Sequence, residues 1–295
     1  MSAFEPAAAA PQAHPAPPAL PELPEGVEPS PVGPGWKAWT AWAALIGGFT
    51  AAIILAVFLG LFASIFGSSL SDPSPAVNIL STVLQGLCLI GAAYVFARAT
   101  GGSRPWDFGL RSTRLMPAIG WSALTWLSFL LVTVGWTALI GAQDKQDTLP
   151  KELGVDDSQV ALVAAAILVC VIAPIAEEFF FRGFFFTALR SWKGIWPAAI
   201  ITGIIFGAIH GGSSDPAFLL PLGFFGFALC LLYVKTGSLY PCIAVHSLNN
   251  SLAFGVAEDW TWQIVPVALA ALLVIVAVMA TIRAATGRPP ALPAT

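Results

Sequence analysis

Charged side chains are scarce in this sequence. Only 10% of its 295 residues are Asp, Glu, Lys or Arg, and 57% are hydrophobic, whereas a soluble domain carries about 25% charged residues. So few charges cannot cover the surface of a globule of this size, which excludes a soluble protein. The formal net charge of −3 leaves no basic footprint for nucleic acid. We therefore predict an integral membrane protein that binds no nucleic acid.

Cysteine is also rare, and it forms no recognisable pattern. The four cysteines lie in apolar runs without CxxC spacing, which favours small buried hydrophobic residues over disulfides or a thiolate zinc site. The sequence contains no GxSxG and no HExxH motif. A serine or cysteine nucleophile therefore has no support from local sequence.

Long apolar runs make up most of the chain, and several reach the roughly 20 residues that cross a bilayer as a helix. Breaks at Gly, Pro and charged residues divide them into about eight transmembrane helices, which predicts an all-α, polytopic bundle. The predicted helices cover residues 38–66, 76–98, 115–141, 158–190, 195–213, 216–235, 238–256 and 261–283. The fourth is too long for one straight span, so Pro174 predicts a kink or a cytoplasmic overhang.

Two tails flank the predicted bundle of residues 36–284. Residues 1–35 are rich in proline and alanine and contain no Lys or Arg, which predicts a disordered cytoplasmic tail rather than a signal peptide. Residues 285–295 form a second, short tail. With the amino terminus in the cytoplasm, ten basic residues fall inside and only Lys145 and Lys151 outside. The positive-inside rule thus predicts eight crossings, both termini cytoplasmic, in a plasma-membrane protein.

Three charged residues interrupt the fourth predicted helix, in the run APIAEEFFFRGFFF. Unpaired at the membrane centre, they would cost on the order of 8–10 kcal/mol, so they must face protein or water. Glu178 and Arg182 are four residues apart and can pair on one helix face. Glu177 lies about 100° around the helix from Glu178. We expect Arg182 to neutralise Glu178 and Glu177 to remain free to act.

Two histidines lie on other predicted helices at similar depth. Gly203, Gly207 and Gly211 form a stripe of small residues that allows close helix packing, and His210 lies near that stripe. His246 and Asn250 are four residues apart on one face of a later helix. At 1.5 Å per residue, Glu177, His210 and Asn250 lie about 18–22 Å from the cytoplasmic edge, and His246 about 12 Å. We therefore expect polar groups from three helices to converge.

This set of side chains suits the addition of water to a carbonyl group. Glu177 can act as general base, His210 can align the water, and His246 and Asn250 can donate hydrogen bonds to the oxyanion. Alternatively, Glu177, His210 and His246 can bind one divalent metal ion such as zinc. The residues alone do not decide between these two versions of hydrolysis.

The motifs Glu177-Glu178-x-x-x-Arg182, Phe206-x-x-x-His210 and His246-x-x-x-Asn250 resemble those of the CAAX protease and bacteriocin-processing (CPBP) family of intramembrane proteases. They occur in the family's order, and the resemblance covers roughly residues 155–256. The segment WDFGLR, residues 106–111, is similar to a stretch often seen upstream of these motifs.

The resemblance implies a helical bundle that cleaves peptide bonds of membrane-associated proteins or peptides, in eukaryotic members after a prenylated cysteine. It implies Glu177 and Glu178 as catalytic carboxylates, His210, His246 and Asn250 as their partners, and Arg182 and Phe206 as structural support. Both metal-dependent and metal-free glutamate mechanisms are compatible with the family. The alternative functions are a proton-coupled transporter, for which buried Glu and His are equally natural, and a catalytically silent membrane scaffold.

Overall fold

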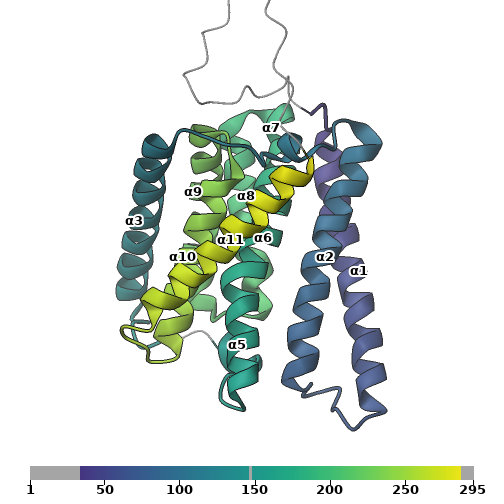
Figure 1. Ribbon diagram of the computed structural model, residues 1–295, viewed down its shortest axis with the longest axis vertical. Helices are drawn as coiled ribbons and strands as arrows, with labels where there is room; N and C mark the ends of the chain where they lie inside the picture. The colour runs from purple at the N-terminus through teal and green to yellow at the C-terminus, as the bar shows by residue number, and fades with distance from the viewer. Residues whose placement is uncertain (1–33, 146–147, 287–295) are drawn as a thin grey trace, which may run out of the picture.

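The computed structural model describes residues 34–145 and 148–286, and within these ranges the protein is built of helices and the turns between them (Figure 1). The long helices are α1 (Ala38–Ser64), α2 (Pro75–Thr100), α3 (Leu115–Ile140), α8 (Ile195–Ile209), α9 (Pro216–Thr236), α10 (Leu239–Ala257), α11 (Ile264–Thr286) and a composite helix. The composite helix runs through α5 (Gln159–Ile167), η2 (Leu168–Ile172), α6 (Ala173–Glu178), η3 (Phe179–Phe186) and α7 (Thr187–Lys193). Three short helices complete the fold, namely η1 (Pro105–Phe108), α4 (Leu149–Glu152) and η4 (His210–Gly212). The predicted all-α polytopic bundle is confirmed, while most of the two predicted tails lies outside the described residues.

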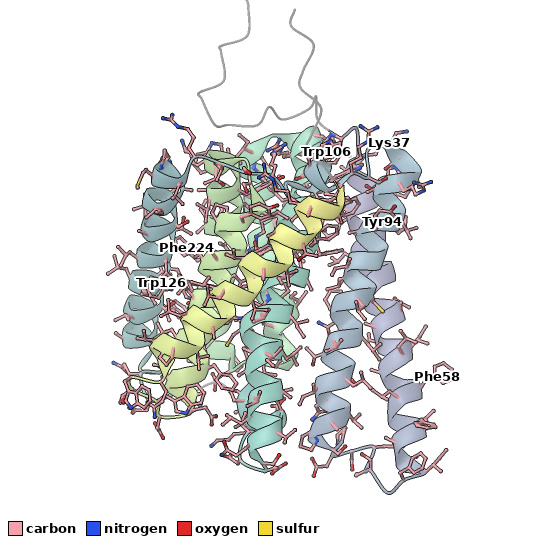
Figure 2. The ribbon with its side chains drawn as sticks, in the orientation of Figure 1. Lys37, Phe58, Tyr94, Trp106, Trp126 and Phe224 are labelled. Atoms are coloured by element: carbon pink, nitrogen blue, oxygen red, sulfur yellow. The ribbon has the colours of Figure 1, made fainter. Side chains whose placement is uncertain are left out.

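Seven helices of the described ranges are long and apolar enough to cross a membrane, and α10 is not among them. Helix α10 carries His246, Asn249 and Asn250 together with two serines, and most of its residues are buried against other helices. By contrast, α1 exposes large apolar side chains such as Phe58, which points away from the bundle (Figure 2). The seventh predicted helix, residues 238–256, is thus present as α10, but it lies inside the protein and does not need an apolar surface.

The two ends of the bundle carry opposite charge. Helix α1 begins and α11 ends at the same end, the top of Figure 1, where Lys37 and Trp106 also lie (Figure 2). We call this the basic end, since it gathers Lys37, Arg98, Arg104, Arg111, Arg114, Arg190, Lys193, Lys235 and Arg283. The opposite, acidic end gathers Asp72, Asp144, Glu152, Asp156, Asp157, Asp215, Glu258 and Asp259, with Lys145 and Lys151. This separation of charge matches the distribution of basic residues from which the topology is predicted.

Polar contacts tie the loops of each end together. At the basic end, the Arg111 guanidinium donates to the Gly237 carbonyl at 2.5 Å, and the Ser238 hydroxyl donates to the Arg111 carbonyl at 2.5 Å. The segment of residues 106–111 therefore fixes the beginning of α10. At the acidic end, Asp215 caps α9 by accepting from the Ala217 N–H. That hydrogen bond, assisted by Lys145 at 3.3 Å, lowers the pKa of Asp215 and keeps it ionised.

Before Pro174, where the sequence predicts a kink or a cytoplasmic overhang, the structure has a π-helical turn. Pro174 has no N–H to offer the Cys170 carbonyl four residues earlier. The Ala173 N–H instead reaches back five residues to the Leu168 carbonyl, which leaves the Val169 and Cys170 carbonyls without their usual partners. Helix α10 supplies replacements, because the Ser247 hydroxyl donates to Cys170 at 2.6 Å and the Asn250 amide donates to Val169 at 2.9 Å.

Because α10 replaces hydrogen bonds that are missing in the composite helix, the stabilities contributed by Ser247 and by residue 174 should be coupled. Replacing Ser247 by Ala leaves a buried carbonyl unpaired and should lower the free energy of unfolding by about 1–3 kcal/mol. The loss should shrink in a Pro174→Ala background, where residue 174 regains an N–H for that carbonyl. Ser251→Ala is the matched control, since Ser251 is equally buried but donates within its own helix. Equal losses from Ser247→Ala in both backgrounds, measured by unfolding in detergent, would contradict this explanation.

Close packing between α8 and α9 sets the position of His210. A Cβ atom on Gly203 would lie 2.6 Å from the Gly223 carbonyl oxygen, and one on Gly207 would lie 2.5 Å from the Leu219 carbonyl oxygen. These two glycines therefore allow the close approach that the sequence predicts. Gly211 does not take part, because its nearest neighbour would be a flexible Leu219 methyl at 3.8 Å.

Candidate active site

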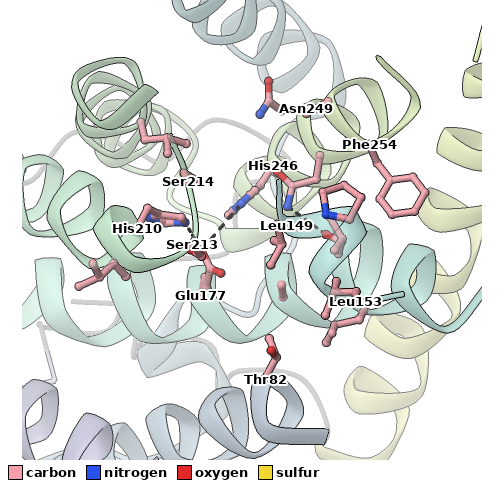
Figure 3. A pocket seen from close by; sticks show the side chains of 18 of the residues that line it. Thr82, Leu149, Leu153, Glu177, His210, Ser213, Ser214, His246, Asn249 and Phe254 are labelled. Atoms are coloured by element: carbon pink, nitrogen blue, oxygen red, sulfur yellow. Dashed lines mark hydrogen bonds and ion pairs between the residues drawn. The ribbon is translucent and has the colours of Figure 1, made fainter. Parts of the chain in front are cut away.

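Glu177, His210 and His246 come together from three different helices (Figure 3). Glu177 lies on α6, His210 follows α8, and His246 lies within α10. Glu177 Oε2 is 4.0 Å from His210 Nε2 and 3.9 Å from His246 Nε2. The expected convergence of one carboxylate and two imidazoles is therefore present in the structure.

A second, fully buried cluster lies behind this group. Glu178 and Arg182 have no exposed side-chain surface, and Arg182 Nη1 donates to Glu178 Oε1 at 2.8 Å. The guanidinium also donates to the Gly226 carbonyl of α9 at 3.2 Å. His246 Nδ1 is 2.7 Å from the same Glu178 oxygen. The expected pairing of Glu178 with Arg182 is present, and His246 links it to Glu177.

The partners of the Nδ1 atoms fix how both imidazoles face Glu177. His210 Nδ1 is 2.6 Å from the Phe206 carbonyl oxygen, which can only accept, so Nδ1 carries a proton. His246 Nδ1 donates in the same way to the carboxylate of Glu178. In the neutral imidazole the other nitrogen then has a lone pair. Each Nε2 atom is therefore an acceptor toward Glu177 when its imidazole is neutral, and a second proton on His246 makes its Nε2 a donor.

Aromatic rings hold the charged and imidazole groups in place. The Arg182 guanidinium lies 4.4 Å from the centre of the Phe206 ring, within the range of a cation–π interaction. The His246 ring meets Phe206 and Phe225 edge to face, with centroid distances of 5.9 and 5.5 Å. Phe206 therefore contacts a residue of each cluster.

Asn250 has a different contact from the one that its spacing suggests. Its amide nitrogen donates to the Val169 carbonyl, so at least one amide hydrogen holds α10 against the π-helical turn. Both Asn250 and its neighbour Asn249 line the same cavity as Glu177, and Asn249 is 8% exposed. Asn250 thus helps to hold the helix that carries His246, and its role as an oxyanion donor stays a prediction.

A cavity of about 220 Å³ lies in front of Glu177, large enough for several water molecules. Sequence reasoning missed many of its walls, which come from segments without charged or paired motifs. They include Thr82 and Gln85 of α2, Leu149, Pro150 and Leu153 at α4, and Ser213 and Ser214 after η4. One residue of this wall, Gln85, could have been found from the sequence, because it lies in an apolar run of α2. An amide is costly in lipid, so such a side chain is expected to face water or protein.

The spacing of the three side chains fits water better than a directly bound metal ion. Zinc binds N and O ligands at about 2.0–2.2 Å in tetrahedral geometry, which places ligand atoms about 3.3 Å apart. The separations here are 3.9 and 4.0 Å, a gap that two hydrogen bonds of about 2.8 Å span at a bent angle. Within residues 34–145 and 148–286, no group of three His, Cys, Asp or Glu side chains is placed to hold a metal ion.

Glu177 Oε2 is a buried acceptor without a hydrogen-bond partner in the described part of the chain. The side chain as a whole is 21% exposed, and that of His210 is 20% exposed. An acceptor in such a position requires a donor, since burying an unpaired carboxylate oxygen is costly. The site therefore offers Glu177 Oε2 and His210 Nε2 as acceptors to one small donor molecule, at the edge of a cavity that is large enough for water.

Comparison with known proteins now adds independent information. Residues 159–252 match the family described as Type II CAAX prenyl endopeptidase Rce1-like. The chain is also 32% identical over 85 residues to a Bacillus subtilis (strain 168) protein named "Putative membrane peptidase YdiL". This similarity covers 29% of the chain and 34% of the relative, so the chain spans about a third of the relative's length. No solved structure matches the chain at a significant level. The matched region contains all three motifs, and the predicted resemblance is confirmed.

Proposed function

We propose, on the premise that the region holding this site matches a prenyl endopeptidase family, that the protein is an intramembrane endopeptidase. Its substrate would be a membrane-associated protein or peptide, a class that includes prenylated C-termini of the CAAX type. The observation that carries the proposal is the convergence of Glu177 Oε2 with two imidazole Nε2 atoms at 3.9–4.0 Å. Carboxylates and imidazoles are the groups that most often transfer protons in hydrolysis.

In the proposed reaction, Glu177 accepts a proton from a water molecule held between it and His210. The water oxygen forms a bond to the carbonyl carbon of the scissile peptide, and the carbonyl oxygen becomes an oxyanion. The proton on Glu177 then passes to the peptide nitrogen as the C–N bond breaks, which yields a carboxylic acid and an amine, and the acid then transfers its proton to the amine. Glu177 is regenerated, and no covalent link to the enzyme is needed.

The role of His246 in this scheme follows from charge balance. Glu177, Glu178 and Arg182 together carry one excess negative charge, so one further proton makes the cluster neutral, as a low-dielectric interior favours. His246 lies between the two carboxylates, at 2.7 Å from one and 3.9 Å from the other. A protonated His246 could donate through Nε2 to the oxyanion, where a fixed donor contributes most.

The zinc alternative stays a prediction of the sequence, and a chelator tests it. A zinc ion would supply Lewis-acid activation of water, but the separations in the site favour the metal-free scheme. We expect the purified protein to keep its peptidase activity after treatment with a strong zinc chelator. Loss of activity that zinc alone restores would contradict the metal-free scheme and leave the peptidase proposal standing.

The experiment that tests the function itself is hydrolysis by purified protein in detergent. A mixture of peptides should yield defined fragments by mass spectrometry, and His210→Ala should reduce the rate by about 10²-fold or more, because the aligned water is lost. Solute or proton flux in liposomes without any cleavage would favour the transporter instead. Neither cleavage nor flux from folded protein would favour the silent scaffold.

A further inference from the structure

The basic end of the bundle is closed above the site by aromatic side chains. In the composite helix, Phe180, Phe181, Phe184, Phe185 and Phe186 are all 0% exposed. The ring of Trp36, which precedes α1, fills the space over them with its centroid 5.0 Å from that of Phe184. A peptide that approached Glu177 from this end would have to displace this packed layer.

The cavity reaches instead toward the acidic end. Its outer walls are α4 and the turn of Ser213 and Ser214. Both lie at that end, since the Asn78 amide at the beginning of α2 donates to the Glu152 carbonyl at 2.8 Å. The turn of Ser213 and Ser214 leads directly into Asp215, which pairs with Lys145. Glu177 and His210 are both about one-fifth exposed, whereas Glu178 behind them is fully buried.

Depth in the membrane agrees with this direction. Helix α8 runs from Ile195 at the basic end to Ile209, 15 residues that rise about 22 Å. With Ile195 taken as the basic-end boundary of a hydrocarbon core about 30 Å thick, His210 would lie about 8 Å from the opposite boundary. The site is therefore closer to the face with few Lys and Arg residues.

We infer that this site takes its substrate from the extracytoplasmic side of the membrane, as a peptide segment displayed at the acidic end. The excess of Lys and Arg assigns the basic end to the cytoplasm, and the cavity opens away from it. The inference rests on the proposed peptidase function and narrows its substrates. C-termini displayed at the cytoplasmic face, prenylated ones included, are excluded, and exported peptides or the outer segments of membrane proteins are the substrate class.

Cysteine labelling tests the direction of the cavity without requiring activity. Ser71→Cys marks the acidic end, Ser103→Cys marks the basic end, and Ser214→Cys marks the cavity mouth. In intact cells, a membrane-impermeant maleimide should label the Ser71→Cys and Ser214→Cys variants. The Ser103→Cys variant should be labelled only after the cells are permeabilised. The unmodified protein gives the background, since Cys170, Cys230 and Cys242 are buried and Cys88 is half-buried. The inference would be overturned if Ser214→Cys were labelled under the conditions that label Ser103→Cys and not under those that label Ser71→Cys.

Cleavage by oriented vesicles tests the substrate side. A peptide that the detergent-solubilised protein cleaves is added either outside or inside proteoliposomes whose orientation the two end markers report. Hydrolysis should occur only on the side of Ser71. Hydrolysis only on the side of Ser103 would overturn the inference and keep the peptidase proposal. Absence of cleavage even in detergent would reject the proposed function, while the labelling would still decide the direction of the cavity.

Discussion

Replacing Glu177 by Gln should abolish peptide hydrolysis and leave a folded protein. Glutamine has the size of glutamate but cannot accept the proton of the attacking water, and loss of a general base costs about 10²–10⁴-fold in rate. The carboxylate oxygen that faces the imidazoles makes no hydrogen bond within the described part of the chain. The exchange therefore removes no hydrogen bond there, and the unfolding temperature should stay close to that of the wild type.

The measurement compares initial rates of cleavage for proteins purified side by side. Glu258→Gln is the matched control, because it makes the same chemical change at the end of α10, away from the cavity lining. Rates within about twofold of wild type are expected for that control. A Glu177→Gln protein that is as active as its control would remove Glu177 from the mechanism.

Replacing Arg182 by Met should have the largest effect on stability. Arg182 and Glu178 are both fully buried, and removing one partner of such a pair costs about 3–5 kcal/mol because an uncompensated charge remains. The guanidinium also donates to the Gly226 carbonyl and lies over the Phe206 ring. We therefore expect a strong decrease in the free energy of unfolding, together with loss of activity, because Glu178, the partner of His246 Nδ1, loses the guanidinium that holds it in place.

The double variant Glu178→Gln with Arg182→Met separates the charge from the packing. Without the carboxylate, no unpaired negative charge is left behind, so the double variant should be more stable than Arg182→Met alone. The glutamine side chain introduced at position 178 keeps a carbonyl oxygen that can accept from His246 Nδ1. Unfolding of the single and double variants in detergent gives the coupling energy directly. A coupling energy near zero would show that the pair does not act as a unit.

Sequence alone predicted the parts of the fold that depend on composition and helical spacing. Low charge and long apolar runs indicate a membrane bundle, and the four-residue spacing of Glu178 and Arg182 predicts a pair that the structure contains. The separation of Glu177 from that pair also follows from helical geometry. These features depend only on composition and on the spacing of residues along one helix, which is why they can be predicted from the sequence.

The role of Asn250 and the link between the two carboxylates depend on contacts that spacing does not show. Helical periodicity placed Asn250 beside His246, but a π-helical turn at Pro174 leaves the Val169 carbonyl free, and Asn250 binds it. His246 contacts Glu178 as well as facing Glu177, which requires a particular rotation of α10 against α6. The cavity walls from α2 and α4 are likewise set by tertiary packing.

A high-resolution experimental map of the purified protein, with anomalous scattering data collected at the zinc edge, tests the central claim most directly. The account predicts one water molecule about 2.6–3.2 Å from Glu177 Oε2 and from His210 Nε2, without an anomalous signal. A zinc signal about 2.0–2.2 Å from Glu177 and both imidazoles would contradict the metal-free scheme. Density that places Glu177, His210 and His246 apart, or on the lipid-facing surface, would contradict the enzyme assignment as a whole.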